Sequence, residues 1–168
     1  MIILIPLLRR GFQENPGGKR SFNGNEKDCK EETLSLIKLF IDGASAGNPG
    51  PAGAGVFVKK NDGEVERYSI PLGQATNHEA EFYALIEGLK LCVANQWHVV
   101  SFSTDSKLVD ESFEKRYTKK SEYQDLLEEA LQLSDQLDLC FVKWIPSTKN
   151  KAADQLSKEA VSKSKGNK

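Results

Sequence analysis

Residues 34–42 read LSLIKLFID, and this stretch predicts the central strand of a sheet. Ile37, Leu39 and Ile41 alternate onto one face, while Leu36 and Phe40 fall on the other. Because both faces are apolar, we expect the strand to be covered on both sides, as buried strands in α/β proteins are.

The residues that follow predict a hairpin and then an alternation of helices and strands. A Gly- and Pro-rich loop, GASAGNPGPAG, precedes the runs GVFVKK and EVERYSIPL, which the turn NDG joins into a hairpin. Apolar spacing then predicts helices over 77–96, 106–115, 121–137 and 150–162, and strands over 98–105 and 139–145. The order βββαβαβα predicts an α/β fold, with a mixed five-stranded sheet and helices on both faces.

One domain accounts for most of the 168 residues. Residues 1–33 open with MIILIPLLRR and continue with a Gly-, Asn-, Lys- and Glu-rich segment, which predicts a disordered or loosely packed extension. The opening apolar run is too short to span a bilayer; a weak membrane contact and a misassigned start codon are the alternatives. We expect the domain to cover 34–162 and a basic tail to follow at 163–168.

The composition is that of an ordinary globular protein and excludes several classes. With 28% charged residues and a formal net charge of −1, the chain is not a polycation that holds nucleic acid by bulk charge. Positive charge gathers locally, because residues 143–168 contain seven Lys against two acids. Cys29, Cys92 and Cys140 form no CxxC pair, which argues against a disulfide scaffold or a structural zinc site and favours the reducing cytoplasm.

Two acids stand at the ends of predicted strands. Asp42 closes the first strand and Asp105 closes the fourth. The carboxyl ends of neighbouring parallel strands open toward the ligand site of an α/β sheet, so we expect these carboxylates to meet. Like charges at such a place favour raised pKa values or bound cations, whereas turn chemistry explains either acid taken alone.

Two further acids lie on predicted helices. Glu79 and Glu81 point about 200° apart on a helix, and only Glu81 falls within the apolar arc. There it needs either an ion-pair partner or a metal. Asp154, early in the last helix, suits the helix dipole if taken alone. Carboxylates without a His or Cys companion are ligands that suit Mg²⁺ or Mn²⁺.

Four ordered segments together resemble type 1 ribonuclease H: DGASAGNPGPAG, TNHEAEFYALIEGL, STDS and W…NKAADQLSKEA. The resemblance covers about residues 34–161 and implies the ribonuclease H fold. It implies an endonuclease that cuts the RNA strand of RNA/DNA hybrids and leaves 5′-phosphate and 3′-hydroxyl ends. By the same resemblance, two Mg²⁺ or Mn²⁺ ions are held by Asp42, Glu81, Asp105 and Asp154. A monomer is the default expectation.

The resemblance also implies which residues contact the hybrid. RNA is distinguished from DNA through its 2′-hydroxyl groups in a wide, shallow minor groove, which small residues and amides suit. Thr76 matches a position that helps to hold a DNA phosphate. The other positions that we expect near the minor groove are Gly43, Ala44, Ser45, Asn48, Asn77 and His78. A Gly/Pro turn and a helix cap are compatible alternatives for these segments.

Three departures from the family pattern concern binding more than chemistry. The loop IPSTK before the last helix has no histidine, Gln74 replaces an arginine, and the basic protrusion of some members is reduced to EKRYTKK. Fewer phosphate contacts predict weaker binding. A hybrid-binding module of the same fold with little or no turnover is therefore the main alternative; a resolvase or transposase core and an actin-like ATPase fragment are weaker ones.

Overall fold

Strand β1 (Ile37–Ser45) lies at the centre of a five-stranded sheet whose order is β3-β2-β1-β4-β5. We describe a computed structural model, which covers residues 35–166. β1 runs antiparallel to β2 and parallel to β4, so the sheet is mixed, as predicted. The other strands are β2 (Gly50–Lys59), β3 (Val65–Ala75), β4 (Val99–Thr104) and β5 (Leu139–Trp144).

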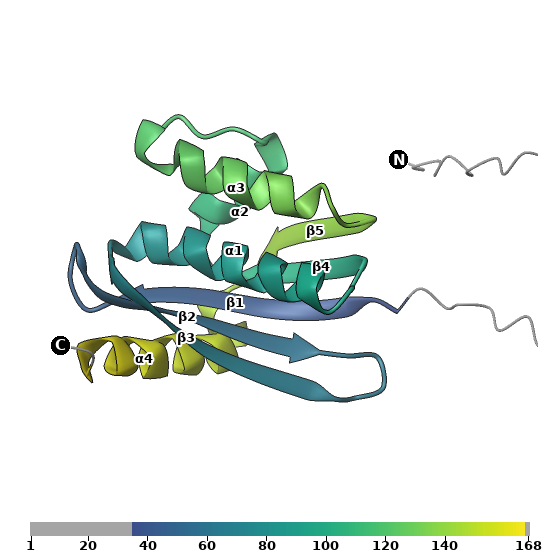
Figure 1. Ribbon diagram of the computed structural model, residues 1–168, viewed down its shortest axis with the longest axis horizontal. Coiled ribbons are helices and arrows are strands. Elements are labelled where there is room, and N and C mark those ends of the chain that lie inside the picture. The colour runs from purple at the N-terminus through teal and green to yellow at the C-terminus, as the bar shows by residue number, and fades with distance from the viewer. Residues whose placement is uncertain (1–34, 167–168) are drawn as a thin grey trace, which may run out of the picture. The chain divides into compact units, whose positions relative to one another are not determined.

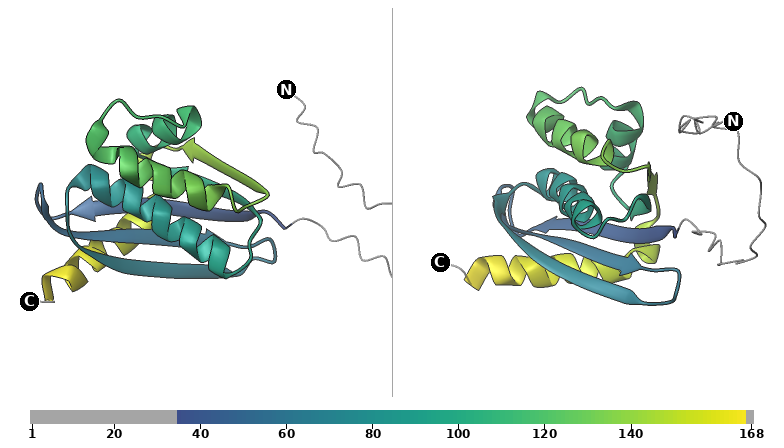
Figure 2. Two further views of the ribbon diagram at one scale, coloured as in Figure 1. Left: turned by 45° about the horizontal axis from the view of Figure 1, so that its top comes forward. Right: turned by 45° about the vertical axis from the view of Figure 1, so that its right-hand side comes forward.

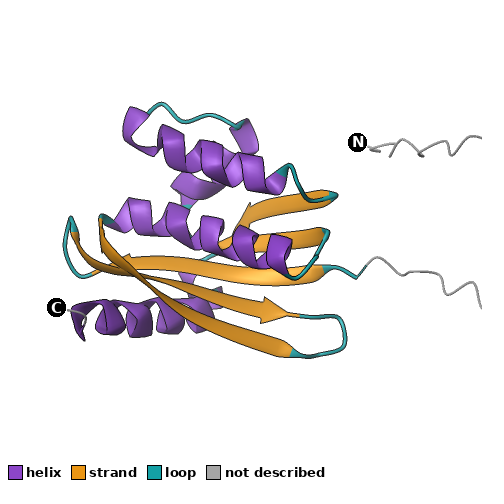
Figure 3. Ribbon diagram, in the orientation of Figure 1, coloured by secondary structure: helices purple, strands orange, loops and turns teal. Residues whose placement is uncertain are grey.

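Helices cover both faces of the sheet (Figure 1), which confirms the predicted fold class. α1 (Asn77–Ala94) and α3 (Gln124–Ser134) lie over one face and α4 (Lys151–Gly166) lies over the other (Figures 1 and 2). α2 (Lys107–Lys115) follows β4, and two short 3₁₀ helices, η1 (Ser121–Tyr123) and η2 (Ser147–Lys149), precede α3 and α4. Figure 3 shows the resulting helix–sheet–helix layering.

The core lies between the sheet and α1. Ile37, Leu39 and Ile41 are buried on the α1 face of β1, as their alternation predicts. Phe82 of α1 is fully buried, and its ring stacks on Tyr123 of η1 at 5.4 Å between centroids, which joins the second helical layer to the first. Because one face of β1 is fixed by this packing, its other face, which carries Phe40 and Asp42, is fixed toward α4.

α4 approaches the opposite face of the sheet closely because β2 has glycines there. A Cβ added to Gly55 would lie 2.2 Å from the carbonyl oxygen of Ala153 in α4. Gly55 pairs with Asp42 of β1 in the sheet. The missing side chain therefore lets the first turns of α4, which carry Asp154, sit directly over the end of β1.

Three predicted boundaries differ from the observed ones. Only residues 46–49 separate β1 from β2, so most of the predicted loop 43–53 is strand. The predicted helix 121–137 is divided into η1 and α3 and ends at Ser134. α4 continues to Gly166, through four residues of the predicted tail. The predicted extension 1–33 lies outside the described residues, and within 35–166 no helix has the length and apolar character needed to cross a membrane.

Candidate active site

The parallel pairing of β1 with β4 brings Asp42 and Asp105 to the same edge of the sheet. Ile41 pairs with Thr104, so the next residue of each strand is one of the two acids. Burial raises the pKa of Asp42 to about 7, and the negative charges of Asp105 and Asp154 add to the rise. The expected meeting of these carboxylates is therefore present in the fold.

α4 supplies both an acid and a hydrogen-bond donor to this place. Ser157 is fully buried, and its hydroxyl donates to Asp42 Oδ2 at 2.5 Å, with Asp154 O as a second acceptor at 2.8 Å. The donation to Asp42 opposes the rise in its pKa. The Asp154 carboxylate itself accepts from Lys158 Nζ at 2.7 Å, one turn further along the helix.

α1 separates the roles of its two glutamates as the helix wheel predicts. Glu79 closes a capping box: its carboxylate accepts from Thr76 N at 2.7 Å while Thr76 Oγ1 accepts from Glu79 N at 3.2 Å. Glu81 instead accepts from Ser106 Oγ at 2.7 Å and faces His78 Nδ1 at 3.1 Å. Ser106 follows Asp105 directly, so Glu81 is tied to the end of β4.

Gly43 sets the distance between β1 and α1. A Cβ at this position would lie 2.1 Å from the backbone carbon of Ala80 and 2.3 Å from the nitrogen of Glu81. No side chain fits there, so the backbone of α1 rests on the strand beside Asp42. The structure thus gives Gly43 a packing role, and its predicted contact with substrate stays a prediction.

The acids suit hard divalent cations by their chemistry, since every predicted ligand is a carboxylate. Asp42 supports this fit, because its buried carboxylate has two acidic neighbours and only one donor, Ser157, among its described hydrogen bonds. As the side chains lie, no group of three or more His, Cys, Asp or Glu residues within 35–166 is arranged to hold a metal ion. In this arrangement Asp42, Glu81 and Asp154 accept hydrogen bonds from Ser157, Ser106 and Lys158.

The residues predicted to contact a hybrid fall in two adjacent segments. Ala44 and Ser45 end β1 and exposed Asn48 lies in the short connection that follows, whereas Thr76, Asn77 and His78 begin α1. Ser45 Oγ donates to the carbonyl of Ala75 at 2.8 Å and so joins the two segments. Their contacts with substrate stay predictions.

Sequence reasoning missed three residues that hold the site together. Ser157 and Asn150 are buried polar residues of the last segment; Asn150 Nδ2 donates to Ile41 O at 2.8 Å, directly before Asp42. Trp144 Nε1 donates to the carbonyl of Asp105 at 3.2 Å. The position of Ser157 three residues after Asp154, one helical turn away, was the one signal of its role in the sequence.

A family model and a curated relative match most of this chain. A family described as reverse transcriptase-like matches residues 40–160. The chain is 40% identical to EbsB of Enterococcus faecalis over 130 residues, which cover 76% of this chain and 96% of that protein.

Solved structures give the same picture. The crystal structure of ribonuclease H1 from Halobacterium salinarum is 29% identical, with a TM-score of 0.72, over 76% of this chain and 98% of that one. A ribonuclease H1 isolated from compost by a metagenomic approach, solved in complex with an RNA/DNA hybrid, is 30% identical with a TM-score of 0.68. That similarity covers 76% of this chain and 97% of the other.

Proposed function

We propose, from the premise that this chain belongs to the ribonuclease H family, that it hydrolyses the RNA strand of RNA/DNA hybrids. The observation that carries the proposal is the half-buried carboxylate of Asp42, which has Asp105 and Asp154 as charged neighbours. Grouping like charges in a partly buried place costs stability, so the grouping favours a catalytic role. The relative solved with an RNA/DNA hybrid supports the choice of substrate.

Asp42, Glu81, Asp105 and Asp154 would hold two Mg²⁺ or Mn²⁺ ions. Bound in this way, the ions would activate the attacking water and stabilise the leaving 3′ oxygen, which gives 5′-phosphate and 3′-hydroxyl ends. Ser157 and Ser106 orient two of these carboxylates by hydrogen bonds. The same two bonds hold the Asp42 and Glu81 carboxylates in place within the protein.

The ends of β1 and β3 and the start of α1 would recognise the hybrid. Asn48 and Asn77 offer exposed amides to the minor groove, where 2′-hydroxyls mark the RNA strand. Thr76, at the N-terminus of α1, lies where the helix dipole favours a phosphate. Ser45 keeps these two segments together through its bond to Ala75.

Cleavage of an end-labelled RNA/DNA hybrid tests the proposal. We expect internal cuts in the RNA strand with Mg²⁺ or Mn²⁺, and none in duplex RNA or duplex DNA. Asp105→Asn should abolish these cuts while the folded protein persists by circular dichroism. Asp138→Asn removes a charge from an exposed acid away from the site and serves as the matched control. Normal cleavage by Asp105→Asn would refute the assignment.

A binding module without turnover is the second candidate, since the described acids do not form a ready ligand set. It predicts that the wild-type protein binds the hybrid but leaves both strands intact with either metal. Cleavage by the wild type that Asp105→Asn loses would exclude this candidate.

A further inference from the structure

The sheet face that carries α4 extends beyond the start of that helix. Two rows of side chains cross the strands there, because paired residues share a face: Phe57, Phe40, Ser103 and Lys143 form one row, and Lys59, Lys38, Ser101 and Phe141 form the other. α4 begins only at Lys151 and covers the next row, at Gly55 and Asp42. We call the six aromatic and basic residues the platform: Phe40, Phe57, Phe141, Lys38, Lys59 and Lys143.

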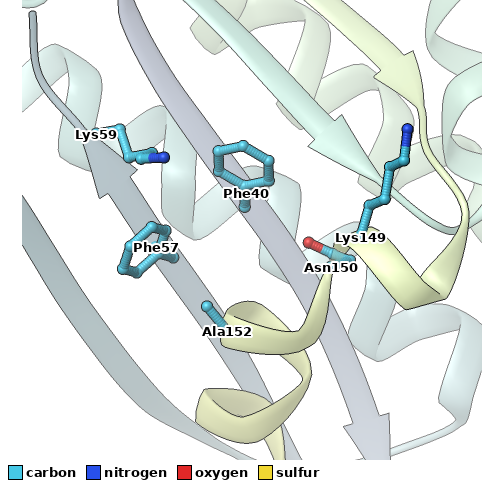
Figure 4. A pocket seen from close by; sticks show the side chains of 6 residues that line it. All are labelled: Phe40, Phe57, Lys59, Lys149, Asn150 and Ala152. Carbon is cyan, nitrogen blue, oxygen red and sulfur yellow. The ribbon is translucent and has the colours of Figure 1, made fainter.

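The aromatic rings of the platform are open to a flat partner. Phe141 is 48% exposed, although an aromatic side chain usually lies inside. Phe40 and Phe57 are half-buried, with ring centroids 6.1 Å apart, and the Arg67 guanidinium lies 5.1 Å from the Phe57 ring. The Phe40 and Phe57 rings line a pocket of about 140 Å³ between the sheet and the start of α4 (Figure 4). One aromatic ring fills a space of about that size.

Positive charge surrounds these rings. Lys38, Lys59 and Lys143 lie on the platform, and Lys149 and Arg67 stand at its margins; all five side chains are exposed. Within residues 35–166 none of them forms an ion pair, although Lys60, Lys90 and Lys158 each pair with Glu or Asp. The two rows contain no acid. In a chain of net charge −1, this face is locally basic and attracts a polyanion.

The pocket also contains an unused hydrogen-bond acceptor. Asn150 is 1% exposed, and its Oδ1 has no hydrogen-bond partner within the described part of the chain. Figure 4 shows that oxygen directed from the start of α4 toward the Phe40 side of the pocket. A buried acceptor without a partner costs free energy.

We propose that the platform binds single-stranded nucleic acid, with bases stacked on the Phe rings and phosphates held by the Lys side chains. Aromatic rings interleaved with Lys on an open sheet face are the combination that single strands use, because every unpaired base has a stacking face. A duplex hides those faces within its own stack, so this role goes beyond cleavage of a hybrid. An acidic peptide would satisfy the lysines but would leave the rings without partners.

Fluorescence anisotropy with a labelled 12-nucleotide oligodeoxycytidylate, in EDTA to prevent cleavage, tests the proposal. We expect Phe141→Ala to weaken binding about tenfold, the effect of losing one stacked base. The double variant Lys38→Ala with Lys143→Ala should make the dependence of log K on log salt concentration less steep by about 1.4, at about 0.7 for each phosphate contact to a single strand. Lys90→Ala, at an exposed position of α1 on the other side of the sheet, is the control and should bind like the wild type.

A second set of measurements distinguishes failure of the platform proposal from failure of the proposed function. Phe40→Leu retains apolar volume but removes a ring, so it should bind weakly while it unfolds normally. All these variants should still cut a blunt hybrid if the proposed function is right. Equal affinity of wild type, Phe141→Ala and the double lysine variant would overturn the platform, whatever happens to the hybrid. A dimer by sedimentation that Phe141→Ala dissociates would make this face a contact between copies and would also overturn it.

Discussion

Replacing Asp42 by Asn in the metal-free protein should stabilise the fold, and by more as the pH rises. Asn keeps the shape of the side chain and an oxygen that accepts from Ser157, but it carries no charge to bury beside Asp105 and Asp154. Because the pKa of Asp42 is raised in the folded state, the folded protein binds more protons than the unfolded one between the two pKa values. Its stability therefore falls as the pH rises through that window, and the fall is absent from Asp42→Asn.

The size of the effect follows from the shift. The rise in the pKa of Asp42 from 3.8 to about 7 lowers the free energy of unfolding by about 4 kcal/mol at pH values above 7. This uses about 1.4 kcal/mol for each pH unit. Between pH 5 and about pH 7 the wild type still loses about 3 kcal/mol of its free energy of unfolding. The free energy of unfolding of Asp42→Asn, measured against that of the wild type, should thus grow by about 3 kcal/mol between pH 5 and pH 8.

Urea unfolding in EDTA, followed by circular dichroism at pH 5 and pH 8, measures this difference. Asp138→Asn, which also removes one charge but from an exposed carboxylate, should track the wild type at both pH values. An advantage of Asp42→Asn that is the same at pH 5 and pH 8 would refute the argument that Asp42 is costly to ionise.

Adding Mg²⁺ at pH 8 extends the same experiment to the proposed metal site. A cation that binds only the folded state stabilises it by mass action. The wild type should therefore gain stability with Mg²⁺ while Asp42→Asn gains little, so the gap between the two proteins narrows. A gap that is independent of Mg²⁺ would count against Asp42 as a ligand.

Three further substitutions have effects that the structure predicts. Ser157→Ala removes the donor that lowers the pKa of Asp42. When the cleavage rate is measured against pH, its rise on the acidic side should therefore shift to higher pH, and an unchanged pH dependence would contradict this role. Gly43→Ala forces a Cβ into the backbone of α1 and should cost more than about 3 kcal/mol, measured by urea unfolding, whereas a small cost would mean that α1 shifts freely. Thr76→Ala breaks the capping box and should cost about 1 kcal/mol, seen as a Tm lower by about 4 °C; an unchanged Tm would show that the cap adds nothing.

The order and type of the main elements were predictable because short-range patterns determine them. Alternation placed Ile37, Leu39 and Ile41 in the core, and NDG fixed the β2–β3 hairpin. The glycine-rich stretch 43–53 was misread as a loop for a physical reason. Gly43 and Gly53 are strand residues that lack side chains because α1 and α4 press on the backbone there, and a sequence pattern does not distinguish that need from a turn.

The site was predictable only in part. The strand ends predicted that Asp42 and Asp105 would meet, because the carboxyl ends of parallel strands share an edge. The wheel of α1 separated Glu81 from Glu79, which acts as a cap. The donors from the last segment were not foreseen, since Ser157 reaches the Asp42 carboxylate across 115 residues of chain and Asn150 reaches the Ile41 carbonyl across 109. Such pairings depend on the docking of α4, which local patterns do not encode.

The order of the elements along the chain also determines when the acids come together during synthesis. A polypeptide leaving the ribosome presents β1, α1 and β4 before α4 has been translated. Until α4 docks on β2, Asp42 has neither Ser157 as a donor nor Asp154 as a neighbour. A nascent chain therefore carries an incomplete set of acids, and the complete set forms only once the segment through α4 has emerged and folded.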